Sequence, residues 1–278
     1  MSERVVNMEY RKKEFNGISY FELGNGNELF VLLSGWGTVY SLADMYHLAT
    51  QLSTNARVII IDRPGYEKST EKIEERTFEN VTKEIASIIG HESPLVKIIL
   101  VGHSLGGAYA LAFAMKYPQM VKSIVCLDMI PYVGIGSSVA YRVSYIPATI
   151  FQLLRVTGFL KLLNKNTVER FLKIQNIPSE IAAEAVHRTY TSLYNRHVMS
   201  ELKALTPFIK GLKINKERCP VPVLVVFRNQ MAGLMDKALP LLTERYASVS
   251  TVNVGTSSHD IHIEKVNTVV ESINEYYL

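Results

Sequence analysis

The chain has 278 residues, of which 47% are hydrophobic and 20% charged, so it can bury a large core and is not a disordered protein. Its two cysteines make no disulfide framework, and it contains no apolar run of about 18 residues that would span a membrane. The net charge is +4, which excludes no class of partner.

Predicted strands are apolar runs bounded by turn signals, and predicted helices have apolar residues at helical spacing. In chain order they are strands 14–23 and 28–33, helix 41–52, strand 58–61, helix 78–89, strands 96–101, 121–127 and 221–227, helix 234–246, strand 249–254 and helix 260–276. The segment Gly24-Asn25-Gly26-Asn27, between the first two strands, is a strong turn signal. The central strands are apolar throughout, which predicts an α/β fold with a mostly parallel sheet covered by helices on both faces.

Residues 131–215 interrupt this alternation. The segment has helical periodicity and few strand signals, and from residue 132 onward it holds eleven Lys and Arg against four Asp and Glu, a balance of +7. It is expected to be a helical insertion at the carboxyl edge of the sheet, where ligands bind in open α/β folds. Its basic character fits a solvated face, anionic substrates or contact with an anionic membrane surface, and a solvated face is favoured over membrane contact.

The pentapeptide Gly102-His103-Ser104-Leu105-Gly106 follows the strand 96–101 directly. It predicts a sharp strand-to-helix turn that holds the Ser104 hydroxyl where a base can reach it. The two glycines suit a strained turn that leaves little room for side chains. A glycine-rich loop beside a core serine is the alternative, but the alanine-rich helix signal that follows favours a nucleophile.

Three further motifs surround this turn in the sequence: Ser34-Gly35-Trp36-Gly37, Asp62-Arg63-Pro64-Gly65-Tyr66-Glu67-Lys68-Ser69 and Ser258-His259-Asp260-Ile261-His262-Ile263-Glu264. In this order the four motifs resemble those of the α/β-hydrolase family, in its capped esterase, lipase and dehalogenase-like form. The resemblance implies an eight-stranded sheet, a core formed by residues 1–131 and 216–278, and a helical cap over residues 132–215. Ser34 and Glu67 depart from the histidine and glycine usual at those positions, but neither change removes a catalytic group.

The resemblance also implies site residues. Ser104 would be the nucleophile and His259 its base, because a serine hydroxyl needs a base within hydrogen-bond reach. The backbone N–H groups of Leu105 and Trp36 would form the oxyanion hole, with Leu105 at a helix N-terminus where N–H groups lack partners. His103 is assigned to packing.

The acid of the triad has two candidates. In most of the family it follows the strand corresponding to 221–227, where this chain reads Arg228-Asn229-Gln230-Met231-Ala232, without a carboxylate. Asp128 closes the apolar strand 121–127, and a buried carboxylate there needs a partner such as a catalytic histidine. Asp128 is therefore favoured, and Asp236 is the alternative.

These assignments predict a serine esterase that cleaves a small-molecule carboxylic ester, with a small or medium apolar acyl group, through an acyl-enzyme. A thioesterase, an acyltransferase, a carbon–carbon bond hydrolase and a non-catalytic binding protein are the alternatives. Serine at the nucleophile position argues against a dehalogenase or epoxide hydrolase. No cofactor, metal or nucleic acid is expected, and the N-terminus lacks a secretory signal, which favours a cytoplasmic location.

Overall fold

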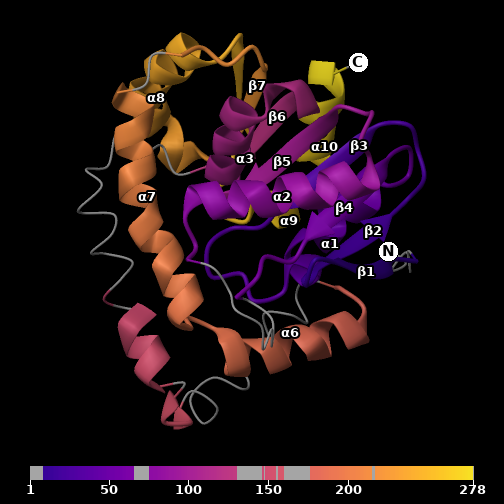
Figure 1. Cartoon of the computed structure of the whole chain (residues 1–278), viewed down its shortest axis with the longest axis vertical. Helices are drawn as coiled ribbons and strands as arrows, with labels where there is room; N and C mark the ends of the chain where they lie inside the picture. Colours follow the sequence, from indigo (N-terminus) through magenta and orange to yellow (C-terminus); the bar gives the residue numbers. More distant parts are fainter. Residues whose placement is uncertain are drawn as a thin grey trace.

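The computed structural model describes residues 9–65, 75–129, 146, 148–154, 156–159, 176–214 and 217–277. Its centre is one eight-stranded sheet in the order β1-β2-β4-β3-β5-β6-β7-β8 (Figure 1). The first two pairings of this order are antiparallel and the other five are parallel, which confirms the predicted mostly parallel sheet. The strands are β1 (Arg11–Phe15), β2 (Ile18–Leu23), β3 (Leu29–Leu33), β4 (Arg57–Ile61), β5 (Ile98–His103), β6 (Val121–Leu127), β7 (Val223–Phe227) and β8 (Val249–Asn253).

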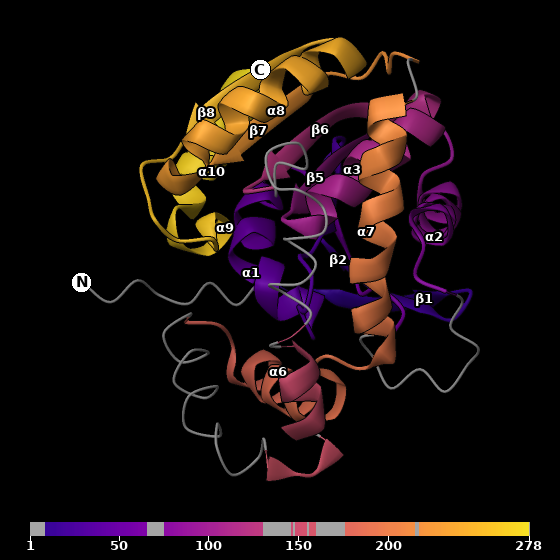
Figure 2. The same ribbon diagram turned by 90° about the vertical axis from the view of Figure 1, so that its left-hand side faces the viewer.

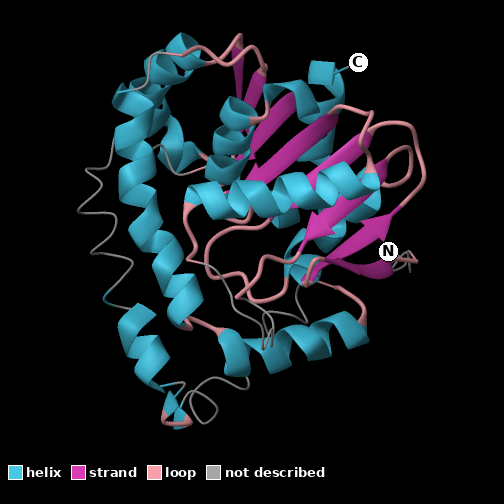
Figure 3. Ribbon diagram, viewed as in Figure 1, coloured by secondary structure: helices cyan, strands magenta, loops and turns pink. Residues whose placement is uncertain are grey.

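Helices cover both faces of the sheet (Figure 3). One apolar core lies beneath α2 (Phe78–Glu92), α3 (Leu105–Lys116) and α8 (Ala232–Arg245), and the other beneath α1 (Ser41–Leu52), α9 (Ile261–Glu264) and α10 (Val266–Tyr277). The side chains of β5 alternate between the two cores, so both of its faces are buried. That double burial explains why the strand is apolar at every position rather than at every second one. Cys126 and Cys219 are both free and buried.

The N-terminal strands differ from the sequence prediction. The expected strand 14–23 is two strands, β1 and β2, because Asn16 and Gly17 adopt positive φ angles of 50° and 72° and turn the chain back on itself. The turn signal at residues 24–27 does not join a hairpin, since β2 pairs with β4 and not with β3. The expected helix 260–276 is likewise two helices, α9 and α10, separated at Lys265.

Two further helices come from the basic segment, α6 (Ser179–Ser192) and α7 (Arg196–Ile214) (Figures 1 and 2). Each adds buried side chains to one apolar core: Leu205 of α7 to the first, and Ile181 and Ala185 of α6 to the second. The described part of residues 132–215 contains helices and turns. The boundaries near residues 131 and 215 fall outside the described residues, so the cap domain stays a prediction. Among the described residues, no helix combines the length and apolar character needed to cross a bilayer.

Candidate active site

Ser104 occupies a strained turn between β5 and α3. Its φ and ψ angles are 51° and −116°, a conformation that non-glycine residues rarely adopt. The turn is held because the Ser104 N–H donates to the carbonyl of Leu127, 2.9 Å away. The flanking glycines are required by space: a Cβ on Gly102 would lie 2.3 Å from the backbone of Gly106, and one on Gly106 would lie 2.1 Å from the Leu33 carbonyl oxygen.

His259 follows β8, and its imidazole meets a carboxylate. Its Nδ1 lies 2.5 Å from Oδ2 of Asp128, the residue that follows β6. Asp128 is buried, whereas the side chain of His259 is 40% exposed. Because the carboxylate accepts here, Nδ1 carries a proton, and in the neutral imidazole Nε2 then holds the lone pair that a general base requires.

Asp128 has a second partner, Arg228. The backbone N–H of Arg228 donates to Asp128 Oδ1 at 3.2 Å, and its guanidinium Nε lies 3.2 Å from Oδ2. The alternative acid, Asp236, is exposed on α8. The structure therefore brings Asp128, and not Asp236, to His259.

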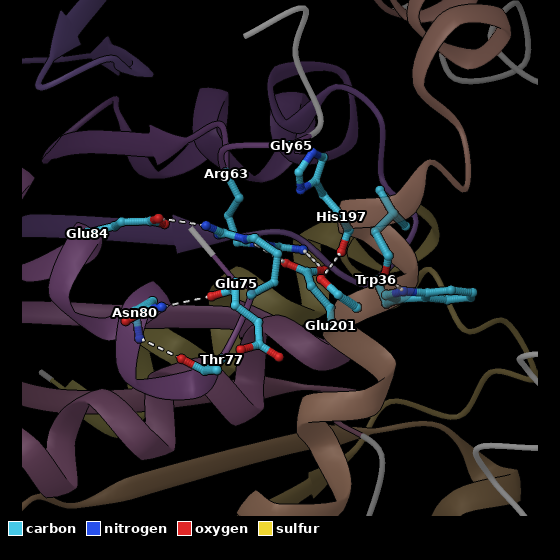
Figure 4. Close-up of polar contacts among 12 residues, drawn as sticks. Trp36, Arg63, Gly65, Glu75, Thr77, Asn80, Glu84, His197 and Glu201 are labelled. Carbon is cyan, nitrogen blue, oxygen red and sulfur yellow. Dashed lines mark hydrogen bonds and ion pairs between the residues drawn. The ribbon is translucent and has the colours of Figure 1, made fainter. Parts of the chain in front are cut away.

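The loop after β3 lies directly against the nucleophile turn. A Cβ on Gly35 would come within 3.3 Å of the Ser104 Cβ, so glycine permits this approach. The indole Nε1 of Trp36 donates to the carbonyl of Val198 at 2.7 Å, which ties the loop to α7 (Figure 4). The guanidinium of Arg63 donates to the carbonyls of both Ser34 and Gly35 in this loop.

Buried imidazoles lie behind the turn. His103 packs between the rings of His259 and His262, with centroids 4.6 and 4.2 Å away, and its Nε2 lies 3.1 Å from the His259 carbonyl oxygen. Burial, with the nearby His262, lowers the pKa of His103 well below 6.5, so the ring is neutral and donates from Nε2. His103 thus contacts the backbone of the base and does more than the packing expected of it.

Among the described residues, one group could offer three metal ligands within 4.8 Å of one another: Asp44, His103 and His262. The rings of His103 and His262 pack on each other, with centroids 4.2 Å apart and planes tilted by 40°, and His262 is paired with Asp44 through Nε2. Nε2 of His103 contacts the His259 carbonyl, while the buried Nδ1 atoms of both imidazoles have no hydrogen-bond partner among the described residues.

Comparisons with known proteins agree with this geometry. A family profile described as alpha/beta hydrolase fold matches residues 28–161. A pimeloyl-[acyl-carrier protein] methyl ester esterase of Proteus mirabilis is 30% identical over 253 residues, 88% of this chain and 90% of its own. The chain belongs to the α/β-hydrolase fold family.

Another relative of this α/β-hydrolase has a different named activity. A 2-hydroxy-6-oxononadienedioate/2-hydroxy-6-oxononatrienedioate hydrolase of a Pseudomonas species is 26% identical over 242 residues, 82% of this chain and 78% of its own. The crystal structure of Cfl2 from Burkholderia cenocepacia aligns over 100% of this chain and 98% of its own, with a TM-score of 0.76 and 18% identity. That likeness concerns the fold.

The sequence motifs predicted part of the candidate active site. The structure places Ser104, Trp36, Leu105, Asp128 and His259 at the carboxyl edge of the sheet, as their strands predict. Two contributors carried no signal of their own: Arg228, which directly follows β7, contacts Asp128, and Glu201, on α7, pairs with Arg63 across 138 residues of sequence.

Proposed function

We propose that this α/β-hydrolase cleaves carboxylic esters through an acyl-enzyme, with Ser104 as nucleophile, His259 as base and Asp128 as acid. The observation that carries the proposal is the 2.5 Å contact between His259 Nδ1 and Asp128, on the edge of the sheet where β5 delivers Ser104 at a strained turn. The methyl ester esterase activity named for the Proteus mirabilis relative supports an ester as the substrate class.

In the proposed reaction, Ser104 Oγ attacks the ester carbonyl carbon while His259 Nε2 takes the hydroxyl proton. Asp128 holds the imidazole in the required tautomer and stabilises the imidazolium. The N–H groups of Leu105 and Trp36 donate hydrogen bonds to the oxyanion that forms in this step. His259 then protonates the leaving alcohol, and a water molecule deprotonated by His259 releases the acid and regenerates Ser104.

The second candidate is carbon–carbon bond hydrolysis with the same residues, which the 2-hydroxy-6-oxononadienedioate hydrolase relative favours. Thioesters are a further acyl substrate that the same site chemistry would admit.

Among the described residues of 146–159, five large apolar side chains are exposed by more than half and so lie on the surface rather than in the core: Ile146, Ile150, Leu153, Val156 and Phe159. A role for this region as the roof of an apolar acyl pocket stays a prediction.

The test is labelling with a fluorophosphonate probe, which reacts with an activated serine. Wild-type protein should be labelled and should hydrolyse p-nitrophenyl butyrate, while Ser104→Ala should do neither. Ser123→Ala is a matched control, because Ser123 is a buried serine on the neighbouring strand β6. Absence of Ser104-dependent labelling would refute the hydrolase mechanism.

Two further experiments address the substrate class and the location. Turnover of a chain-length series of p-nitrophenyl esters, compared with turnover of a vinylogous 1,5-diketone, distinguishes ester hydrolysis from carbon–carbon bond hydrolysis. Cell fractionation tests the proposed cytoplasmic location.

A further inference from the structure

Arg63 lies two residues beyond the end of β4 and donates hydrogen bonds to the loop after β3, which lies against Ser104. Its Nη1 donates to the carbonyl of Ser34 at 2.6 Å, and its Nη2 donates to the carbonyl of Gly35 at 2.9 Å. The side chain is 2% exposed, so water does not compete for these bonds. Two donors of one rigid guanidinium therefore hold two consecutive peptide groups.

These bonds determine which way the loop's N–H groups point. In a trans peptide the carbonyl and the N–H point in opposite directions. The Ser34 carbonyl shares its peptide with the N–H of Gly35, and the Gly35 carbonyl shares its peptide with the N–H of Trp36. Holding both carbonyls toward Arg63 fixes the direction of both N–H groups, which point away from Arg63, and donors of fixed direction are what an oxyanion hole requires.

Arg63 is itself held by a residue of α7. Glu201 accepts from Arg63 Nε at 3.1 Å and from Nη2 at 3.4 Å, and Glu201 is fully buried (Figure 4). A buried guanidinium needs a counter-charge, and this one receives it from a helix of the basic segment. Glu201 thus fixes the guanidinium on one edge while the loop carbonyls fix it on another.

We propose that Arg63 is a positioning residue of the oxyanion hole, and that Glu201, by orienting Arg63, makes α7 part of the same apparatus. The inference rests on the proposed function, in which the Trp36 N–H stabilises the oxyanion. Removing an oxyanion donor typically lowers kcat by about 10²–10³. A loosened loop should cost part of that factor, and it should do so in kcat rather than in KM.

The test compares two buried arginines of one network. Arg63→Lys keeps the charge beside Glu201 but loses the two-pronged grip on the loop. Arg76→Lys is the matched control: Arg76 is fully buried, donates to Glu84 at 2.6 Å and lies 4.0 Å from Glu201, and its Nε and Nη2 have no hydrogen-bond partner among the described residues. It therefore shares the burial and the charge of Arg63 without the bonds to the loop.

For Arg63→Lys, kcat for p-nitrophenyl butyrate should fall about 10- to 100-fold with KM within about two-fold. Affinity for a trifluoromethyl ketone, which mimics the tetrahedral intermediate, should weaken by the same factor. Arg76→Lys should lower the melting temperature but leave kcat per folded molecule within about two-fold of wild type. The double variant Arg63→Met/Glu201→Met removes both buried charges together, and it should lose at least as much kcat as Arg63→Lys.

A loss of thermal stability with unchanged kcat and ketone affinity in Arg63→Lys would overturn the proposal. A measurement that does not depend on turnover distinguishes failure of this proposal from failure of the hydrolase mechanism. The carbonyl ¹³C resonances of Ser34 and Gly35 should move upfield in Arg63→Lys, because they lose hydrogen bonds, and should stay in place in Arg76→Lys. Unmoved resonances refute the positioning of the loop, whereas missing Ser104-dependent labelling refutes the esterase reaction alone.

Discussion

Asp128 closes β6 between two groups that compete for its carboxylate. His259 lies on Oδ2 at 2.5 Å, and the guanidinium Nε of Arg228 lies 3.2 Å from the same oxygen. Arg228 begins the segment after β7, where most α/β-hydrolases carry the acid and where this chain has Met231 near the usual acid position and no carboxylate. The chain instead places its carboxylate at the end of the adjacent strand β6, and the acid still meets the histidine from the same edge of the sheet.

Asp128→Asn should lower kcat for p-nitrophenyl esters on the order of 10⁴-fold, because the amide can no longer hold the proper tautomer of His259 or stabilise its cation. The amide oxygen can still accept from the Arg228 N–H, so the fold should survive, as near-ultraviolet circular dichroism would check. Asp236→Asn, which changes an exposed acid on α8, is the control and should retain activity. Equal activity of the two variants would place the acid elsewhere.

Residues that act through a local motif could be predicted, and residues that act through a distant partner could not. Ser104 could be predicted because the turn around it requires glycine at positions 102 and 106. A Cβ at either position would lie 2.1–2.3 Å from backbone atoms. Arg63 belongs to a recognisable motif, yet its role depends on Glu201, which is 138 residues away and sits in an ordinary amphipathic helix. No local pattern records such a pairing, because it arises only when α7 packs on the core.

At the level of elements, α1 and α9 are joined by an ion pair between a fully buried His262 and a partly buried Asp44. His262 Nε2 lies 3.2 Å from Asp44 Oδ1. Burial alone would raise the pKa of Asp44, but His262 outweighs it and lowers that pKa to about 2. Burial would likewise lower the pKa of His262, whereas Asp44 raises it above 6.5. Each partner thus favours the charged form of the other.

The pH dependence of stability follows from these directions. The contribution of Asp44 is present above its unfolded pKa of about 3.9 and is lost as pH falls toward 2. The contribution of His262 is complete below its unfolded pKa of about 6.5 and is lost as pH rises through its raised folded pKa. The pair therefore stabilises the protein most between about pH 4 and pH 6.5.

Asp44→Asn should lower the free energy of unfolding by roughly 2 kcal/mol at pH 6, and the difference from wild type should shrink by pH 9. Urea unfolding followed at pH 5, 6, 7.5 and 9 measures it. The double variant Asp44→Asn/His262→Gln, which has no titrating partner left, should show a stability that no longer follows this profile. A constant difference between Asp44→Asn and wild type across the whole range would contradict the ion pair.

The elements themselves show where sequence reasoning fails. The hairpin between β1 and β2 depends on Asn16 and Gly17, a strong hairpin signal hidden inside a run that also reads as one continuous strand. The pairing of β2 with β4 cannot be read from the turn at residues 24–27, because a local turn signal does not say which strand, distant in the sequence, lies beside β2 in the sheet. Buried parallel strands were found because burial on both faces leaves a continuous apolar run.

On the scale of the whole molecule, two residues of opposite charge follow β4, and each pairs with a counter-charge on a different helix of the basic segment. Asp62 pairs with Arg188 of α6 at 2.5 Å, and Arg63 pairs with Glu201 of α7 at 3.1 Å. The guanidinium of Arg188 also lies over the ring of Tyr40, 4.1 Å from its centroid. Reversing either charge on the core would bring like charges together, so this pattern specifies how the two helices dock.

Trp36 makes this docking measurable, because it is the only tryptophan of the chain and bonds to the Val198 carbonyl of α7. Arg188→Met leaves Asp62 without its guanidinium partner, and breaking a buried pair costs about 3–5 kcal/mol. In wild-type protein, tryptophan fluorescence and far-ultraviolet circular dichroism should report one coincident urea transition. In Arg188→Met the fluorescence midpoint should fall on the order of 1 M below the dichroism midpoint, because α6 and α7 detach before the sheet unfolds. Lys203→Met, which removes an exposed charge from α7, should keep the two transitions together. If the transitions of Arg188→Met also coincide, the two helices unfold with the core whether or not the pair with Asp62 is present.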